Sequence, residues 1–133
     1  MKKSLTPPRR GKFSIPFTRL KNAVLGQSFE LSLVFTDNVF SRRLNAKYRG
    51  ENKPANVLSF SLSKKLGEIF INLVTAKKEA RKFKMSFKDF VTFLFIHGLL
   101  HLKGMEHGDT MERAEKKLLY GTSNLGRHRH RNF

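Results

Sequence analysis

The stretch Ser86–His107 reads SFKDFVTFLFIHGLLHLKGMEH, and it is the segment that most strongly decides the fold. Ser86 followed three residues later by Asp89 is typical of a helix start, because the serine hydroxyl can accept from a backbone N–H of the first turn. Apolar residues then occur nearly all round the helix, as in a buried central helix. Gly104 can adopt positive φ, so we predict that the helix ends there.

The segments around this helix predict a single domain of the α/β class, of α+β type. Strands are predicted at 29–36, 57–61 and 66–73, and helices at 18–25, 38–48, 74–84 and 110–120. We expect about four strands in a mixed sheet, with the central helix packed on one face and the other helices around it.

Particular residues are assigned to helix caps and to a buried face. Asp37 and Asp109 are predicted to cap the helices that follow them. In the basic helix 74–84, we expect Ala76, Ala80 and Phe83 to point inward and the cations outward.

The composition indicates one domain with a polyanionic partner. The 133 residues, 39% of them hydrophobic, suffice for one compact core. The formal net charge is +17, so a polyanion is the expected partner. Residues 1–12 carry +5 and residues 127–133 carry +3, which leaves +9 on the rest. We predict a disordered basic arm at 1–12, a folded domain at 13–121 and a disordered basic tail at 122–133.

Cysteine is absent, which excludes disulfides, thiolate metal sites and cysteine nucleophiles. Any metal must therefore be held by histidine and carboxylate side chains. The basic N-terminal residues are followed by no apolar leader segment, and no run approaches the length of a membrane span. We expect a cytoplasmic protein with no membrane partner.

Three histidines are spaced so that they can meet at one point. His97 and His101 lie one turn apart on the same helix face, so both rings can reach one cation. Alone, the pair could equally be two core histidines. Gly104 allows the chain to turn back, which brings His107 over the same point. Together they predict one metal ion per chain, with zinc as the expected metal.

The chemistry of such a site follows from its open position. Three neutral imidazoles leave the full divalent charge available to polarise a water, whose pKa can fall to about 7 on zinc. A structural site would instead need a fourth protein ligand, and Glu106 and Asp109 are the nearby candidates. The spacing also resembles the zinc motif of metzincin proteases, but Gly98 stands where those have a glutamate base. A peptidase is therefore disfavoured.

The run His97–His107, HGLLHLKGMEH, resembles the YbeY family of bacterial endoribonucleases, also called ribosomal RNA maturation factors. Similar blocks precede it in the family's order, so that the resemblance covers about residues 29–120. These blocks are Leu44-Asn45, Tyr48-Arg49-Gly50, Lys53-Pro54, Val57-Leu58-Ser59-Phe60 and Leu66-Gly67-Glu68-Ile69.

The resemblance implies a mixed α/β fold, zinc on the three motif histidines and cleavage of single-stranded RNA. It also implies a role in ribosome quality control and in maturation of small-subunit ribosomal RNA at its 3′ end. The implied partners are ribosomal RNA and the small ribosomal subunit, without a small-molecule cofactor. Arg49 matches the family's functionally important arginine, and its guanidinium suits a phosphate.

Two positions depart from the family's usual pattern. Glu106 stands where the family usually has Asp directly before the third histidine, and its carboxylate could still orient the site. Ala55-Asn56 replaces Thr-Asp, which removes a charge that another residue would have to supply.

Basic side chains outside the motif are candidates for RNA binding, because phosphate contacts supply most non-specific affinity. The candidates are Arg49, Lys53, Lys77, Lys78, Arg81 and Lys82. The nucleophile stays open between metal-activated water and a 2′-hydroxyl, with Glu68 and Glu106 as candidate bases. The alternative function is a ribosome-associated assembly factor that binds RNA with little or no cleavage.

Overall fold

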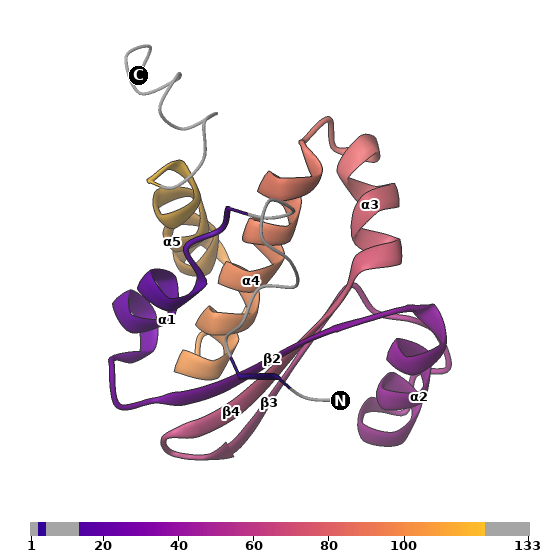
Figure 1. Ribbon diagram of the computed structural model, residues 1–133, viewed down its shortest axis with the longest axis horizontal. Coiled ribbons are helices and arrows are strands. Elements are labelled where there is room, and N and C mark those ends of the chain that lie inside the picture. The colour runs from indigo at the N-terminus through magenta and orange to yellow at the C-terminus, as the bar shows by residue number, and fades with distance from the viewer. Residues whose placement is uncertain (1–2, 5–13, 122–133) are drawn as a thin grey trace.

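The computed structural model describes residues 3–4 and 14–121, which form a mixed sheet and five helices (Figure 1). The strands are β1 (Lys3–Ser4), β2 (Glu30–Thr36), β3 (Val57–Ser63) and β4 (Leu66–Asn72). The helices are α1 (Phe17–Leu25), α2 (Asn38–Arg49), α3 (Leu73–Lys82), α4 (Phe87–Lys103) and α5 (Asp109–Tyr120). Within these ranges, every helix is too short or too polar to cross a membrane.

The sheet is built on three strands of seven residues in the order β2-β4-β3. β2 and β4 run parallel, with Leu33 opposite Ile69, and β3 runs antiparallel to β4, with Leu58 opposite Phe70. The two-residue β1 pairs antiparallel with β2 on the side away from β4. The predicted mixed sheet is confirmed: it consists of three full strands, with the two-residue β1 added at its edge.

The central helix α4 forms as its sequence predicts. Ser86 Oγ accepts from the backbone N–H of Asp89 at 3.0 Å, and Gly104 ends the helix at φ 106°. α4 packs on one face of the sheet and contacts α1, α3 and α5 (Figure 1). Its residues Phe95, Ile96 and Leu99 are 0% exposed, so the main core surrounds this helix.

The second face of the sheet is covered as well. Val34, Leu58 and Phe70 form a smaller core cluster, against which Leu44 of α2 packs. Side chains alternate between the two faces of β2, and Val34, on the face opposite Leu31 and Leu33, is also buried, at 6% exposure. α2 is the reason, since it covers the side of the sheet opposite α4 (Figure 1).

The helix ends show one confirmed cap and two corrections. Asp37 caps α2 as predicted, accepting from the N–H of Phe40 at 3.0 Å. Asp109 is not a cap, because Gly108 at φ 152° occupies the N-cap position and Asp109 is the first helical residue. Ala76 and Ala80 of α3 are buried as predicted, whereas Phe83 is 58% exposed. α3 ends at Lys82, so Phe83 leaves the helix's buried face.

The two predicted basic ends fall almost wholly outside the described residues. Of the arm at 1–12, only Lys3–Ser4 is described, and this pair extends the sheet at β2. The tail at 122–133 lies outside the described residues.

Candidate metal centre

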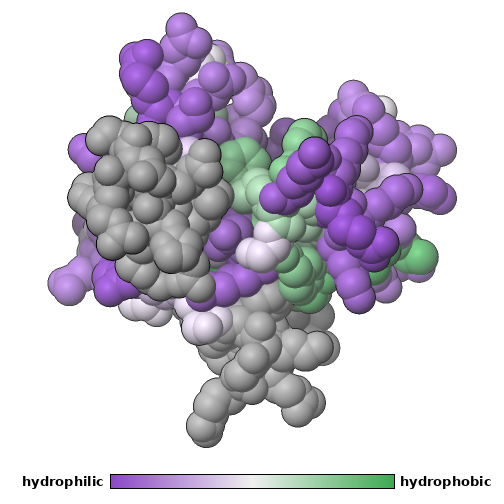
Figure 2. Space-filling view, turned by 90° about the horizontal axis from the view of Figure 1, so that it is seen from above, coloured by the Kyte–Doolittle hydropathy of each residue, from purple (hydrophilic) through white to green (hydrophobic). Residues whose placement is uncertain are grey.

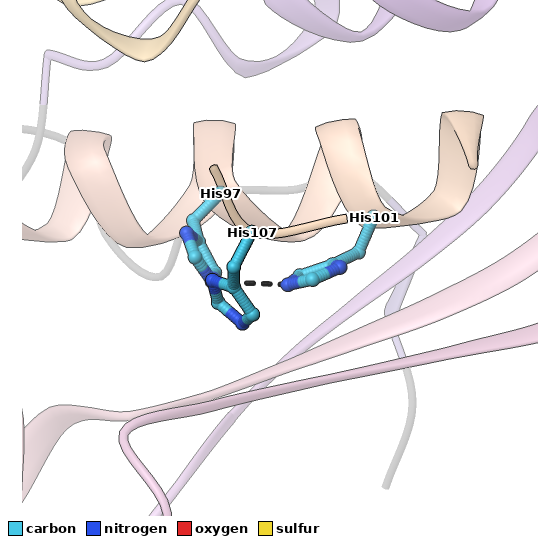
Figure 3. Close-up of side chains that lie close together, drawn as sticks. All are labelled: His97, His101 and His107. Carbon is cyan, nitrogen blue, oxygen red and sulfur yellow. Dashed lines mark hydrogen bonds between the residues drawn. The ribbon is translucent and has the colours of Figure 1, made fainter. Parts of the chain in front are cut away.

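The structure brings the three predicted histidines together. His97 and His101 project from α4, and His107 comes from the turn before α5, so that the rings point toward one another (Figure 3). Their ring centroids lie 4.6 Å apart for His97 and His101, 5.1 Å for His97 and His107, and 4.7 Å for His101 and His107. One potential ligand atom from each lies within 4.8 Å of the others, so the group could hold a metal ion.

The turn after α4 follows from Gly104. In its left-handed conformation, the Gly104 N–H donates to the His101 carbonyl at 2.9 Å, and the Met105 N–H donates to the Leu100 carbonyl at 3.0 Å. These bonds reverse the chain within one turn of the helix end, as expected for a left-handed helix cap. His107 is thereby carried back over the face that bears His97 and His101.

The orientation of the two helical imidazoles fits a metal. His97 Nδ1 contacts the carboxylate of Glu115, and His101 Nδ1 lies 3.2 Å from the Met105 carbonyl oxygen. Acceptors at both Nδ1 atoms place the ring protons there, as is usual for histidines that bind metals through the other nitrogen. The two Nε2 atoms then face each other at 3.1 Å. Two facing lone pairs repel unless a positive charge lies between them.

The separation of these nitrogens also matches zinc geometry. Two nitrogens bound at 2.0–2.1 Å and at a tetrahedral angle lie about 3.3 Å apart. The observed Nε2 to Nε2 distance is 3.1 Å. His97 and His101 therefore fit two corners of a tetrahedral ion, and His107, whose ring nitrogen lies within 4.8 Å of theirs, could supply a third.

Burial lowers the pKa of His101 below its usual value, and the neighbouring His97 and His107 rings lower it further. The Met105 carbonyl acts in the opposite direction, and the nearby Arg49 guanidinium again lowers this pKa. The neutral form of His101 is favoured as a result, and the neutral imidazole is the form that binds a metal.

Arg49 lies at the same pocket as the histidines. This pocket has a volume of about 610 Å³, and its lining includes Arg49, Asn56 and Ser59 beside the three histidines. The Arg49 guanidinium donates to the Ser59 carbonyl at 3.1 Å and lies 5.5 Å from the centroid of the Phe60 ring. The pocket thus combines potential metal ligands with a cation that suits an anionic substrate.

Close packing against the sheet explains why position 98 is a glycine, which could not be predicted from the sequence. A Cβ atom at this position would lie 2.9 Å from Ser59 Oγ and 3.0 Å from Ile69 Cδ1. Glycine therefore allows α4 to approach β3 and β4 closely, and Ser59 Oγ donates to the Gly98 carbonyl at 3.2 Å. A peptidase-type glutamate at this position would collide with the sheet.

The two candidate bases lie in different places: Glu106 is in the turn directly before His107, and Glu68 is on the other face of the sheet. Glu106 is exposed, and among the described residues its side chain has no hydrogen bond to a histidine. Glu68 lines a different pocket, together with Phe40 and Phe70, on the sheet face covered by α2. The carboxylate that contacts a histidine is that of Glu115 on α5.

Glu115 is not among the residues predicted for the site, although the pattern of α5 contains a signal for it. Met111, Glu115 and Leu119 recur every four residues and form the buried face of α5. A charged residue within such a stripe is rarely buried without a partner. Glu115 is 6% exposed, and its partner is His97.

The predicted RNA-binding cations lie on exposed surfaces. Lys53 pairs with Glu51 at 3.6 Å, and its side chain is 72% exposed. Four cations of α3 are exposed, namely Lys77, Lys78, Arg81 and Lys82. α3 is joined to the pocket wall because Asn56 Nδ2 donates to Glu79 Oε1 at 2.8 Å. Asn56, where the family usually has Asp, lies just before β3 and thus donates to a carboxylate of α3.

Comparisons with known proteins show which family the chain resembles. The family model for Endoribonuclease YbeY matches residues 15–122. The chain is 40% identical over 104 residues to the Endoribonuclease YbeY of Rhizobium etli, covering 68% of this chain and 61% of that protein. It is 35% identical over 112 residues to that of Neorickettsia sennetsu, and this match covers 76% of this chain and 78% of that protein. It is 36% identical over 107 residues to the Heliobacterium modesticaldum protein, and this match covers 68% of this chain and 64% of that protein.

The chain spans about three fifths of the length of several of these curated relatives. Among solved structures, the solution structure of a Thermotoga maritima protein is similar, with a TM-score of 0.57 and 23% identity. That likeness covers 77% of this chain and 76% of the other, and it supports the fold.

Proposed function

The chain belongs to the YbeY endoribonuclease family, and from that premise we propose that it is a zinc-dependent endoribonuclease acting on single-stranded RNA. Its proposed substrate is the ribosomal RNA of the small subunit, which it would cleave at the 3′ end. Its proposed role is ribosome maturation and quality control in the cytoplasm. The observation that carries the proposal is the group of three imidazoles, with nitrogens within 4.8 Å of one another, in one pocket with Arg49.

Each residue of the pocket has a role in this proposal. A zinc ion on His97, His101 and His107 would supply a Lewis acid for the charge that develops on phosphate oxygens. Glu115 and the Met105 carbonyl hold the imidazoles of His97 and His101 with their Nε2 atoms toward the centre. Arg49 donates from its guanidinium to the scissile phosphate and stabilises the same charge.

The basic surfaces of α3 and of the loop at Lys53 are proposed to bind the RNA backbone. α3 is fixed beside the pocket by the contact between Asn56 and Glu79, so its exposed cations flank the strand's path. Such contacts to phosphates are independent of sequence. Specificity for ribosomal RNA must therefore arise elsewhere on the substrate or its ribosomal subunit.

Two nucleophiles are compatible with this site, and their products differ. Attack by water leaves a phosphate monoester on one fragment and a hydroxyl on the other. Attack by the adjacent 2′-hydroxyl leaves a 2′,3′-cyclic phosphate and a 5′-hydroxyl. Mass spectrometry of the fragment ends decides between the two reactions.

One experiment tests the proposed function. Bound zinc and cleavage of a single-stranded 3′ fragment of small-subunit ribosomal RNA are measured for the parent, His101→Ala and Arg49→Ala. Arg19→Ala, an exposed arginine of α1, is the matched control. We expect His101→Ala to lose zinc and cleavage. Arg49→Ala should keep zinc but cleave roughly a hundredfold more slowly, as when a charge-stabilising donor is removed.

The outcomes separate the competing functions. A parent that binds zinc and RNA without cleaving would favour the assembly factor. Proteolysis of casein that disappears in His101→Ala would favour a peptidase. Cleavage that survives in His101→Ala would refute the assignment of the reaction to this pocket.

A further inference from the structure

A second pocket adjoins the candidate metal centre and has a different lining. Its volume is about 530 Å³, and it lies among the turn between α3 and α4, α4 itself and α5. Most of its lining is aromatic or apolar, namely Phe83, Met85, Phe90, Phe93, Leu119 and Tyr120. Asn56 lines this aromatic pocket and the histidine pocket alike, so the two are neighbours.

A row of rings leads from the aromatic pocket to the metal centre. Phe83 stacks on Phe90 with centroids 5.9 Å apart and an interplanar angle of 16°. Phe90 lies 5.9 Å from Phe93, and Phe93 lies 6.1 Å from the ring of His97. The aromatic surface therefore begins one ring away from a proposed metal ligand. The distance between the rings of Phe93 and His97 is comparable with that between the phosphate and the base of one nucleotide.

Part of the hydrophobic surface of the aromatic pocket is exposed to solvent. Phe83 is 58% exposed, and it lies in the turn that connects α3 to α4. Figure 2, the view from above, shows a hydrophobic strip between two hydrophilic flanks on the face toward which this turn points in Figure 1. Apolar surface with a polar rim is typical of a binding site.

The charges around the aromatic pocket indicate what it binds. Lys82 Nζ lies 5.8 Å from the centroid of the Phe83 ring, and Lys116 lines the pocket. Lys84, next to Phe83, is also exposed. Aromatic rings with cations at the rim suit a group that is flat and apolar on its faces and attached to phosphates. Asn56 and Glu112, which also line the pocket, can hydrogen-bond to the edge of such a group. Glu115, the second carboxylate of the lining, is already paired with His97.

We propose that the aromatic pocket binds an unpaired nucleobase of the RNA strand whose scissile phosphate lies at the metal centre. This inference rests on the proposed function and adds a subsite to it. Unpaired bases are commonly bound by stacking on aromatic side chains, with basic residues along the backbone. A base within a duplex cannot leave its stack at low cost, so this subsite would also favour single strands over duplexes.

The test uses a series of single-stranded oligoribonucleotides, each with one abasic residue at a different distance from the mapped cleavage position. The specificity constant for cleavage is measured for the zinc-loaded parent on the intact strand and on each abasic strand. We expect one position near the cleaved bond at which the missing base lowers this constant roughly five- to hundredfold. This part of the test requires no variant.

The variants Phe83→Leu and Phe93→Leu locate the effect. Each keeps an apolar side chain but removes a ring, and each should lower cleavage of the intact strand while leaving little further loss at the sensitive abasic position. Phe40→Leu is the matched control, because Phe40 is a partly exposed phenylalanine of α2 in the pocket on the other sheet face. Zinc content should equal that of the parent in all three variants.

Failure of the subsite and failure of the proposed function give different results. A parent that cleaves every abasic strand as well as the intact one would overturn the subsite alone. Equal cleavage by Phe83→Leu, Phe93→Leu and Phe40→Leu would do the same. A zinc-loaded parent that neither binds nor cleaves the intact strand would overturn the proposed function and the subsite together.

Discussion

Replacing Glu115 by alanine should weaken zinc binding, although Glu115 is not one of the proposed ligands. Its carboxylate contacts His97 Nδ1, which leaves Nε2 of that ring directed at His101. Without the carboxylate, the His97 ring can rotate, and its Nδ1 proton loses an acceptor. The variant should therefore bind zinc less tightly while retaining all three histidines.

The expected loss of zinc affinity follows from how far the contact between His97 and Glu115 is buried. The side chains of His97 and Glu115 are 20% and 8% exposed, so water replaces the lost acceptor only in part. Removing such orienting partners typically lowers metal affinity about ten- to hundredfold. We expect a loss near the upper end for Glu115→Ala. Glu115→Gln, whose amide oxygen can still accept from Nδ1, should lose about tenfold.

Zinc affinity is measured by competition with a chelator of known affinity, on variants whose circular dichroism matches the parent. Glu106→Ala is the matched control, since it removes the same charge beside His107 from an exposed position. Its affinity should change less than about fivefold, as expected for an exposed charge. Equal losses in Glu115→Ala and Glu106→Ala would show that only net charge matters and would refute the orienting role.

Three further substitutions test the packing and the basic surface. Gly98→Ala should lower the free energy of unfolding by about 1–3 kcal/mol in urea titrations, because its Cβ would meet Ile69 at 3.0 Å; unchanged stability would contradict this close approach. Asn56→Asp should destabilise the fold by about 1 kcal/mol at neutral pH, because it sets a second carboxylate against Glu79. The double variant with Glu79→Gln should recover that stability, and the absence of recovery would argue against the contact. Arg81→Gln should reduce the slope of log affinity for RNA against log salt by about one, and an unchanged slope would exclude Arg81 from the RNA interface.

The features that the sequence predicted well depend on neighbouring residues. Ser86 and Gly104 bound α4 through hydrogen bonds within one turn, and the spacing of His97, His101 and His107 fixes their convergence through the same turn. Local backbone geometry decides such features, so they can be inferred without knowledge of the tertiary structure.

The features that could not be predicted from the sequence depend on contacts between segments that are distant along the chain. Glu115 meets His97 only because α5 folds back along α4, and Asn56 meets Glu79 across 23 positions of sequence. Burial of Val34 requires α2 to cover the second face of the sheet. The pattern predicts Phe83 on the buried face of a helix that runs to residue 84, but α3 ends at Lys82 and the ring stacks on Phe90 instead.

We propose that His97, His101 and His107 together hold one zinc ion. Native mass spectrometry of the metal-loaded chain, compared with His101→Ala prepared identically, tests it most directly. We expect one zinc ion per chain in the parent and none retained in the variant. The same zinc content in both proteins, or no zinc in the parent, would contradict it.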